Sequence, residues 1–294
     1  MCFRFAMRRG FPAAVLLVTL MVTLAGVAVL APSPVCAQQP AAPDVPAEQV
    51  PIEGRMATLS DFGSEDLAYL AVPRTPPLGA IIILHDRFGI NKQMKAITNS
   101  FAEQGYIAIT PDLFNGQMAT DSSRADSLSA NLRNESALKT LNAVVKLLTT
   151  SPKFKVDRFA VLGWGMGGKL ALESLADLKN PKGLRALAVF YPAVGNIPRK
   201  LVGRVRVPTI AYFGSADTRV PPMQVQEWER RMKSEGARLT VYTVEAGTDF
   251  ADPNSATYAR NVYFQCWANC VEFLRSEIGK DKSNVLDKMN RLFD

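Results

Sequence analysis

The chain has 294 residues, of which 48% are hydrophobic and 21% charged, which is typical of a folded globular protein and excludes a disordered or fibrous chain. Three of its 34 basic residues lie in residues 1–37, which contain no acidic residue. Residues 38–294 therefore hold 31 basic and 27 acidic residues, a net charge of +4 compared with +7 for the whole chain. This near balance, with no basic run interleaved with aromatic residues, predicts no nucleic-acid partner.

Residues 1–37 have the pattern of an export signal. Arginines come first, an apolar run follows over residues 11–32, and Val35 and Ala37 place small residues where a signal peptidase reads them. We therefore expect cleavage after Ala37 and a periplasmic or secreted protein. The apolar run is also long enough to cross a bilayer, so a retained anchor in the inner membrane is the alternative, and it would be the only membrane contact.

After a Pro- and Ala-rich linker over residues 38–51, the sequence predicts a single domain over residues 52–278. Apolar runs there alternate with helical patterns. Strands are predicted at 55–60, 66–72, 79–85, 106–111, 158–163, 186–191, 207–213 and 239–244, and helices at 92–104, 133–150, 166–177, 223–235 and 256–277. Residues 279–294 are polar with apolar residues at helical spacing, which predicts an amphipathic C-terminal tail.

The strands over 79–85 and 158–163 contain continuous apolar runs, as expected of central strands that are buried on both faces of a parallel sheet. Together with the alternation of strands and helices, these runs predict an α/β fold with helices on both sides of the sheet.

The segment from Gly163 to Leu170, between a predicted strand and a predicted helix, is the most informative motif. It satisfies G-x-G-x-x-G of dinucleotide-binding proteins, but no acid for the ribose follows at the end of the next strand. It also resembles a phosphate-binding loop, yet Leu170 stands where a hydroxyl should bind Mg²⁺. The third interpretation is a nucleophile elbow, G-x-Nu-x-G, whose small flanking residues permit a sharp turn. Its central position is Gly165.

The order of motifs along the chain favours the elbow. The segments are 85–91, 105–106 with 111–114, 163–168, 213–221 and 245–258. In this order and spacing, residues 56–273 resemble the dienelactone hydrolase family. The resemblance implies an α/β-hydrolase fold, with a mostly parallel central sheet of about eight strands flanked by helices.

The resemblance also implies a triad of Cys or Ser, His and Asp. Carried onto this sequence, the acid is Asp217, the nucleophile position is Gly165 and the histidine position is Thr248. Glycine has no nucleophile and a threonine hydroxyl is no base at neutral pH, so acyl transfer by this route is not expected. We predict a catalytically impaired, ligand- or protein-binding member of the family. An ester or lactone hydrolase with a rearranged site and a non-catalytic scaffold are the alternatives.

A cleft is expected at the carboxyl ends of the strands, because α/β proteins bind ligands there. Asp86 could be a polar anchor in it or simply the ion-pair partner of Arg87. No cofactor is expected, nor a metal, since one histidine and two separated acids lack ligand spacing. The cleft is predicted to be mostly apolar, to suit a small apolar ligand or a protein partner, and to be lined by His85, Asp86, Arg87, Phe88, Trp164, Met166 and Phe250.

Cys266 and Cys270 lie four residues apart on a predicted helix. Side chains so placed on one regular helix are poorly oriented for a disulfide, which needs Cβ atoms about 3.5–4.5 Å apart. We expect two small buried residues instead.

Overall fold

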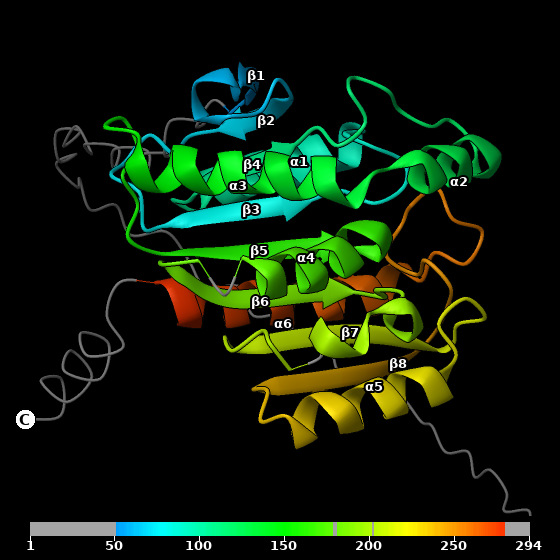
Figure 1. Cartoon of the computed structure of the whole chain (residues 1–294). Helices are drawn as coiled ribbons and strands as arrows, with labels where there is room; N and C mark the ends of the chain where they lie inside the picture. The colour runs from blue at the N-terminus through cyan, green and yellow to red at the C-terminus, as the bar shows by residue number, and fades with distance from the viewer. Residues whose placement is uncertain (1–50, 179–180, 202, 280–294) are drawn as a thin grey trace, which may run out of the picture. The chain divides into compact units, whose positions relative to one another are not determined.

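The structure is a computed structural model that describes residues 51–178, 181–201 and 203–279 (Figure 1). The predicted leader, nearly all of the linker and all of the predicted tail after Gly279 lie outside the described residues. Within the part that is described, no helix combines the length and the apolar character needed to cross a membrane.

Eight strands form one sheet in the order β1-β2-β4-β3-β5-β6-β7-β8. β1 and β2 pair in antiparallel fashion with each other, as β2 does with β4, and the other pairs are parallel. This confirms the predicted mostly parallel sheet and all eight predicted strands. The strands are β1 (Arg55–Thr58), β2 (Leu67–Ala71), β3 (Ala80–Leu84), β4 (Ile107–Pro111), β5 (Phe159–Trp164), β6 (Leu184–Phe190), β7 (Thr209–Ala216) and β8 (Leu239–Gly247).

Six α-helices are described, of which five were predicted from the sequence and α2 was missed. The helix predicted to begin at residue 256 begins at 260, because residues 249–258 form successive turns. The helices are α1 (Lys92–Glu103), α2 (Ser122–Asn131), α3 (Asn134–Thr150), α4 (Gly165–Asp177), α5 (Pro222–Ser234) and α6 (Arg260–Ile278), with 3-10 turns η1 (Ser60–Phe62), η2 (Val194–Asn196) and η3 (Arg199–Leu201).

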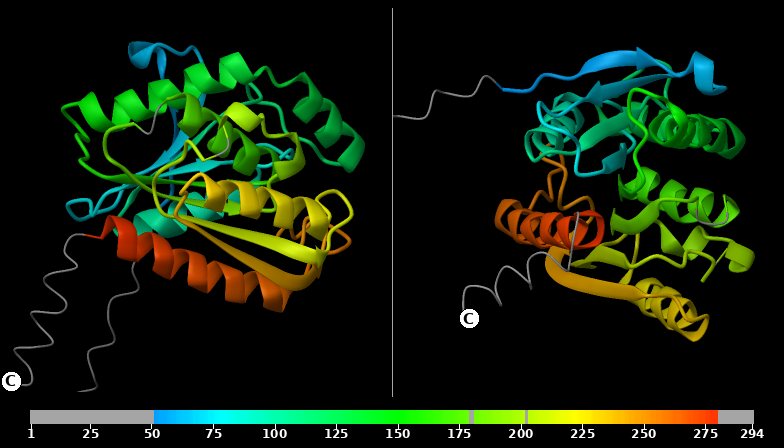
Figure 2. Two further views of the ribbon diagram at one scale, coloured as in Figure 1. Left: turned by 60° about the horizontal axis from the view of Figure 1, so that its bottom comes forward. Right: turned by 90° about the vertical axis from the view of Figure 1, so that its left-hand side faces the viewer.

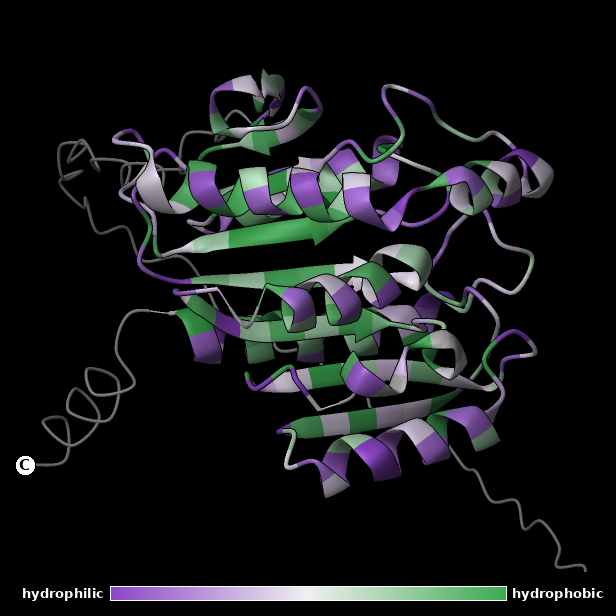
Figure 3. Ribbon diagram, viewed as in Figure 1, coloured by the Kyte–Doolittle hydropathy of each residue, from purple (hydrophilic) through white to green (hydrophobic). Residues whose placement is uncertain are grey.

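The sheet is covered on both faces, with α1 and α6 on one side and α3, α4 and α5 on the other (Figure 2). Successive strand residues point to opposite faces. In β3, Ile81 and Ile83 accordingly join the core under α1 and α6, whereas Ile82 and Leu84 join the core under α3 and α4. The central strands are therefore continuously hydrophobic (Figure 3), which is what burial on both faces requires.

The loops that follow the parallel strands all lie at the same edge of the sheet, because parallel strands end on the same side. Asp86 follows β3, Gly165 follows β5, Tyr191 follows β6, Asp217 follows β7 and Thr248 follows β8. These residues are far apart in sequence, but their strands are neighbours, so the fold gathers them where ligands commonly bind in α/β proteins.

Candidate active-site pocket

The segment between β5 and α4 is the sharp turn that the glycine motif predicted. A Cβ atom on Gly167 would lie 2.4 Å from the backbone oxygens of Leu84 and His85, and one on Gly163 would lie 2.7 Å from the backbone of Gly167. Backbone cannot yield to such contacts, so both positions require glycine because strand and helix approach so closely. This geometry is that of a nucleophile elbow.

Gly165 stands at the centre of this elbow with a φ of +48°, in the left-handed region that costs a residue with a side chain about 1–2 kcal/mol. Space is not what excludes a side chain, since a Cβ atom there would approach nothing closer than the Tyr191 ring at 3.6 Å. The elbow thus presents an empty position to the pocket where a nucleophile would project.

The carboxylate of Asp217 is held by the loop that follows β7. It is buried, and its Oδ1 accepts hydrogen bonds from the backbone N–H groups of Arg219 at 2.8 Å and Val220 at 2.9 Å. Thr248 Oγ1 donates a third hydrogen bond to the same oxygen, at 2.8 Å. Ala216 pairs with Gly247 in the sheet, so the residues that follow them meet. Thr248 therefore contacts the acid from the position predicted for a histidine, with a hydroxyl in place of an imidazole.

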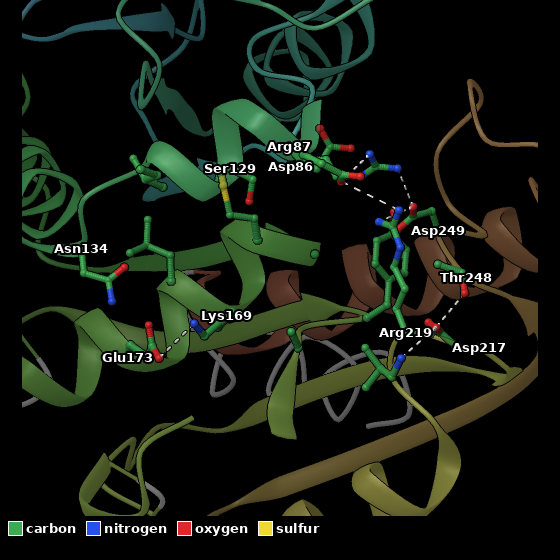
Figure 4. A pocket seen from close by; sticks show the side chains of 18 residues that line it. Asp86, Arg87, Ser129, Asn134, Lys169, Glu173, Asp217, Arg219, Thr248 and Asp249 are labelled. Carbon is green, nitrogen blue, oxygen red and sulfur yellow. Dashed lines mark hydrogen bonds and ion pairs between the residues drawn. The ribbon is translucent and has the colours of Figure 1, made fainter. Parts of the chain in front are cut away.

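A pocket of about 310 Å³ opens over Gly165 (Figure 4). Asp217 and Thr248 border it from one side and α2 and α4 from the other. Five of its 18 lining residues are acidic and three are basic, so the pocket carries many charged groups that the prediction of a mostly apolar cleft did not include. The lining consists of Asp86, Arg87, Asp126, Ser129, Leu132, Asn134, Gly165, Met166, Lys169, Leu170, Glu173, Tyr191, Ala193, Asp217, Arg219, Val220, Thr248 and Asp249.

Four charged side chains form an ion-pair network at the mouth of this pocket. Arg87 pairs with Asp126 at 3.0 Å and with Asp249 at 3.1 Å, and Arg219 pairs with Asp249 at 3.4 Å and more distantly with Asp126 at 3.9 Å. Figure 4 shows the two guanidinium groups converging on Asp249. The network joins the loops after β3, β7 and β8 to α2.

Asp86 is not the ion-pair partner of Arg87, which corrects one of the two interpretations of this residue. Its side chain turns back on its own loop, where Oδ1 accepts the backbone N–H of Phe88 at 2.8 Å. Burial, reinforced by the carboxylates of Asp252 and Asp249, raises the pKa of Asp86 to about 7. The residue lines the pocket, as predicted.

His85 does not line the pocket, so its prediction as a cleft residue is wrong. It is fully buried, and both ring nitrogens bond to backbone: Leu113 N–H donates to Nε2 at 3.2 Å, so Nδ1 carries the proton and donates to the oxygen of Asp86 at 2.7 Å. Burial lowers the pKa of His85, which keeps the ring neutral. The side chain is a satisfied core histidine that also packs against Phe114.

Of the other predicted cleft residues, Arg87 and Met166 line the pocket and the three large aromatic residues do not. Phe88 borders a separate hollow near Asn91. Trp164 is buried and stacks on Phe190, and Phe250 is buried against the Tyr191 ring. The prediction placed them in the cleft because they flank the motifs, but their side chains point into the core beneath it.

Sequence reasoning missed several lining residues, chiefly Tyr191, Lys169, Arg219 and Asp249. Tyr191 could have been found, because it directly follows a predicted central strand at the edge where the other motifs end. Asp126 gave no such signal, since its helix was not predicted.

Cys266 and Cys270 are both free and buried under the sheet, which confirms the prediction. Among the described residues, no group of three or more His, Cys, Asp or Glu side chains is arranged to hold a metal ion.

The eight-stranded sheet, the elbow and the acid loop define an α/β-hydrolase fold. Within that class, the chain belongs to the dienelactone hydrolase family, whose model matches residues 67–278. This confirms the resemblance found in the sequence.

Two relatives illustrate the likeness. The chain is 25% identical over 224 residues to the "probable 2-oxo-3-(5-oxofuran-2-ylidene)propanoate lactonase" of a Bradyrhizobium species, covering 72% of this chain and 90% of the relative. It is 26% identical over 201 residues to the carboxymethylenebutenolidase of Pseudomonas putida, covering 65% and 83%.

Solved structures share the fold at lower identity. A dienelactone hydrolase-like promiscuous phosphotriesterase from metagenomic libraries superposes with a TM-score of 0.68 at 17% identity, covering 78% of this chain and 99% of the other. An esterase of Thermogutta terrifontis superposes with a TM-score of 0.57 at 19% identity, covering 79% and 95%.

Proposed function

We propose that this protein is an exported, catalytically impaired member of the dienelactone hydrolase family that binds a small polar ligand in the pocket over Gly165. The observation that carries the proposal is the hydrogen bond from Thr248 to Asp217 opposite a glycine elbow. The acid position is kept, but the two groups that would attack a carbonyl and accept a proton are replaced. A ligand with polar groups replaces the apolar one expected from sequence, since the lining is charged.

The chemistry of acyl transfer supports this proposal. A hydroxyl becomes a useful nucleophile only beside a base. The pocket offers the hydroxyls of Ser129, Thr248 and Tyr191, whereas both nitrogens of His85, the only histidine in the sequence, are bonded to backbone. What remains is the polarising effect of backbone N–H groups at the elbow, which gives a residual acceleration of about 10³ over water at most.

Restoring the two missing groups tests the proposal. We expect the unaltered protein to hydrolyse 4-nitrophenyl acetate at no more than this residual rate. Gly165→Cys with Thr248→His should exceed the unaltered protein by roughly 10²-fold, since a positioned base contributes at least that much. The space at position 165 and the free approach to Asp217 make the revival feasible.

Matched controls are the two single variants and the double variant with Asp217→Asn, none of which should gain appreciable activity. Substantial turnover by the unaltered protein, or an acyl adduct on one of its side chains seen by mass spectrometry, would contradict the proposal. A small molecule carried through purification in the unaltered protein would favour ligand binding over a scaffold role.

A lactone hydrolase with a rearranged site is a second candidate, and Asp86 is the observation that favours it. A pocket carboxyl whose pKa is raised to about 7 suits a general base that draws a proton from water. Because relatives are named as a lactonase and a carboxymethylenebutenolidase, the assay uses lactones, beginning with dihydrocoumarin. Turnover abolished by Asp86→Asn would replace the first proposal with this one.

A further inference from the structure

Tyr191 lines the pocket, and its buried hydroxyl has no hydrogen-bond partner among the described residues. Tyr191 directly follows β6, is only 4% exposed and has a φ of +40°, held by a hydrogen bond from its backbone N–H to the oxygen of Tyr212 at 2.7 Å. Its ring lies beside Gly165, at 3.6 Å from where a Cβ atom would be. Its Oη is buried and makes no hydrogen bond in the structure. Buried hydroxyls nearly always have a partner, so this one points to a missing ligand group.

Of the three carboxylates that act on this hydroxyl, Asp249 is paired with Arg87 and Arg219, whereas Asp86 has no ion-pair partner among the described residues. Burial, reinforced by the carboxylates of Asp86, Asp249 and Asp252, raises the pKa of the Tyr191 hydroxyl well above its ordinary value of 10. Asp86 is 6% exposed and lines the pocket, yet within the described part of the chain its carboxylate accepts only the hydrogen bond from Phe88 N–H.

The basic side chains of the pocket are already engaged elsewhere. Arg87 and Arg219 bond to Asp126 and Asp249 at the mouth, and Lys169 pairs with Glu173 at 3.6 Å. The pocket therefore has five carboxylates against three cations, which leaves Asp86 and Asp217 without a basic partner in the described ranges; Asp217 accepts three hydrogen bonds, whereas Asp86 accepts one. A bound anion would meet this charge without compensation, whereas a cation would relieve it.

We propose that the pocket binds a ligand through a protonated amino group, which donates hydrogen bonds to the Asp86 carboxylate and to Tyr191 Oη. This inference rests on the proposed function of the pocket as a binding site and names the ligand class. An ammonium group has three donors, enough for both oxygens, and charge-assisted hydrogen bonds of this kind are the strong ones. A metal ion is a poorer fit, because the described residues supply no ligand set for one.

Three probes of equal chain length test the inference: n-butylammonium, butyramide and butyrate. They are titrated against the purified protein at pH 8, where Asp86 is ionised, at constant ionic strength and followed by NMR. We expect butylammonium to bind at least about tenfold more tightly than the other two. Asp86→Asn should weaken butylammonium binding by at least about tenfold and Tyr191→Phe by about threefold. Glu65→Gln removes the same charge at an exposed position outside the pocket and should change nothing.

Equal or tighter binding of butyrate or butyramide, no binding of butylammonium, or butylammonium binding that Asp86→Asn leaves unchanged would each overturn the inference. The comparison of the three probes on the unaltered protein decides the matter even if a variant does not fold. Preferred binding of butyrate would refute the amine but keep the pocket as a binding site. Ester turnover would refute the proposed function and leave butylammonium binding to be judged by itself.

Discussion

At the scale of single residues, two glycines of the elbow and Gly116 in the loop after β4 differ in the reason why they are glycine. Gly167 faces backbone oxygens at 2.4 Å, whereas Gly165 and Gly116 have positive φ but no close neighbour. We predict that Gly165→Ala and Gly116→Ala each lower the free energy of unfolding by about 1 kcal/mol, the cost of the left-handed conformation. Gly167→Ala should cost more than about 3 kcal/mol, because backbone must move.

Urea unfolding of the three variants measures these differences. Equal costs at Gly165 and Gly167 would contradict the assignment of strain to one and steric contact to the other. A low cost at Gly165 would also show that the elbow can carry a nucleophile, which the revival experiment requires.

Asp86 makes the stability of the protein depend on pH. Its pKa rises from an ordinary 3.8 to about 7 on folding, so between these values the folded protein holds a proton that the unfolded chain has lost. Its stabilising contribution is complete below pH 4 and disappears as the pH rises through 7. Asp86→Asn keeps an acceptor for Phe88 N–H, and we predict that it raises the free energy of unfolding by about 2–4 kcal/mol more at pH 8 than at pH 4.

Denaturant unfolding of both proteins across this pH range checks the sign and the size. Asp61→Asn, at an exposed position of η1, serves as the control and should track the unaltered protein. If the free energy of unfolding of Asp86→Asn, relative to that of the unaltered protein, decreased from pH 4 to pH 8, the raised pKa of Asp86 would be refuted.

At the scale of elements, the ion-pair network joins α2 to three loops, and its pairs differ in burial. The side chains of Arg87 and Asp249 are 13% and 18% exposed, whereas Asp126 is 59% exposed. We predict a coupling free energy of about 1–3 kcal/mol between Arg87 and Asp249, and below about 1 kcal/mol between Arg87 and Asp126.

Double-mutant cycles built from Arg87→Met, Asp249→Asn and Asp126→Asn measure both couplings. Asparagine suits position 249 because it tolerates the φ of +55° that Asp249 adopts. In about 0.5 M NaCl the coupling to Asp126 should vanish and that to Asp249 should persist. A larger coupling free energy for Arg87 with Asp126 than for Arg87 with Asp249 would show that burial does not set the strength of these ion pairs.

The missed helix α2 and the displaced start of α6 share a cause. α2 buries only Ala125 and Leu128, so its sequence carries almost no hydrophobic periodicity. Before α6, the carboxylate of Asp252 accepts the N–H of Asn254, which favours a turn over the helix expected there. The central strands were predicted well because a strand that is buried on both faces needs a continuous run of apolar residues, which is visible in the sequence.

At the scale of the whole molecule, the sequence of residues 1–37 predicts where the protein acts. We predict that a host with a general secretion pathway exports the protein and cleaves it after Ala37, so that the mature chain begins at Gln38. Intact-mass measurement on the periplasmic fraction checks this. An uncut chain in the membrane fraction would favour the alternative of an anchor over residues 11–32.

The sequence alone determined the fold, the elbow and the retained acid. These features can be read from local patterns: continuous apolar strands, glycines where two backbone segments approach closely, and the order of the motifs. It also determined that positions 165 and 248 lack a nucleophile and a base. Only the tertiary structure decided which side chains face the pocket. Asp86 and Tyr191 line the pocket and His85 does not, because side-chain direction depends on hydrogen bonds and burial between segments far apart in the chain.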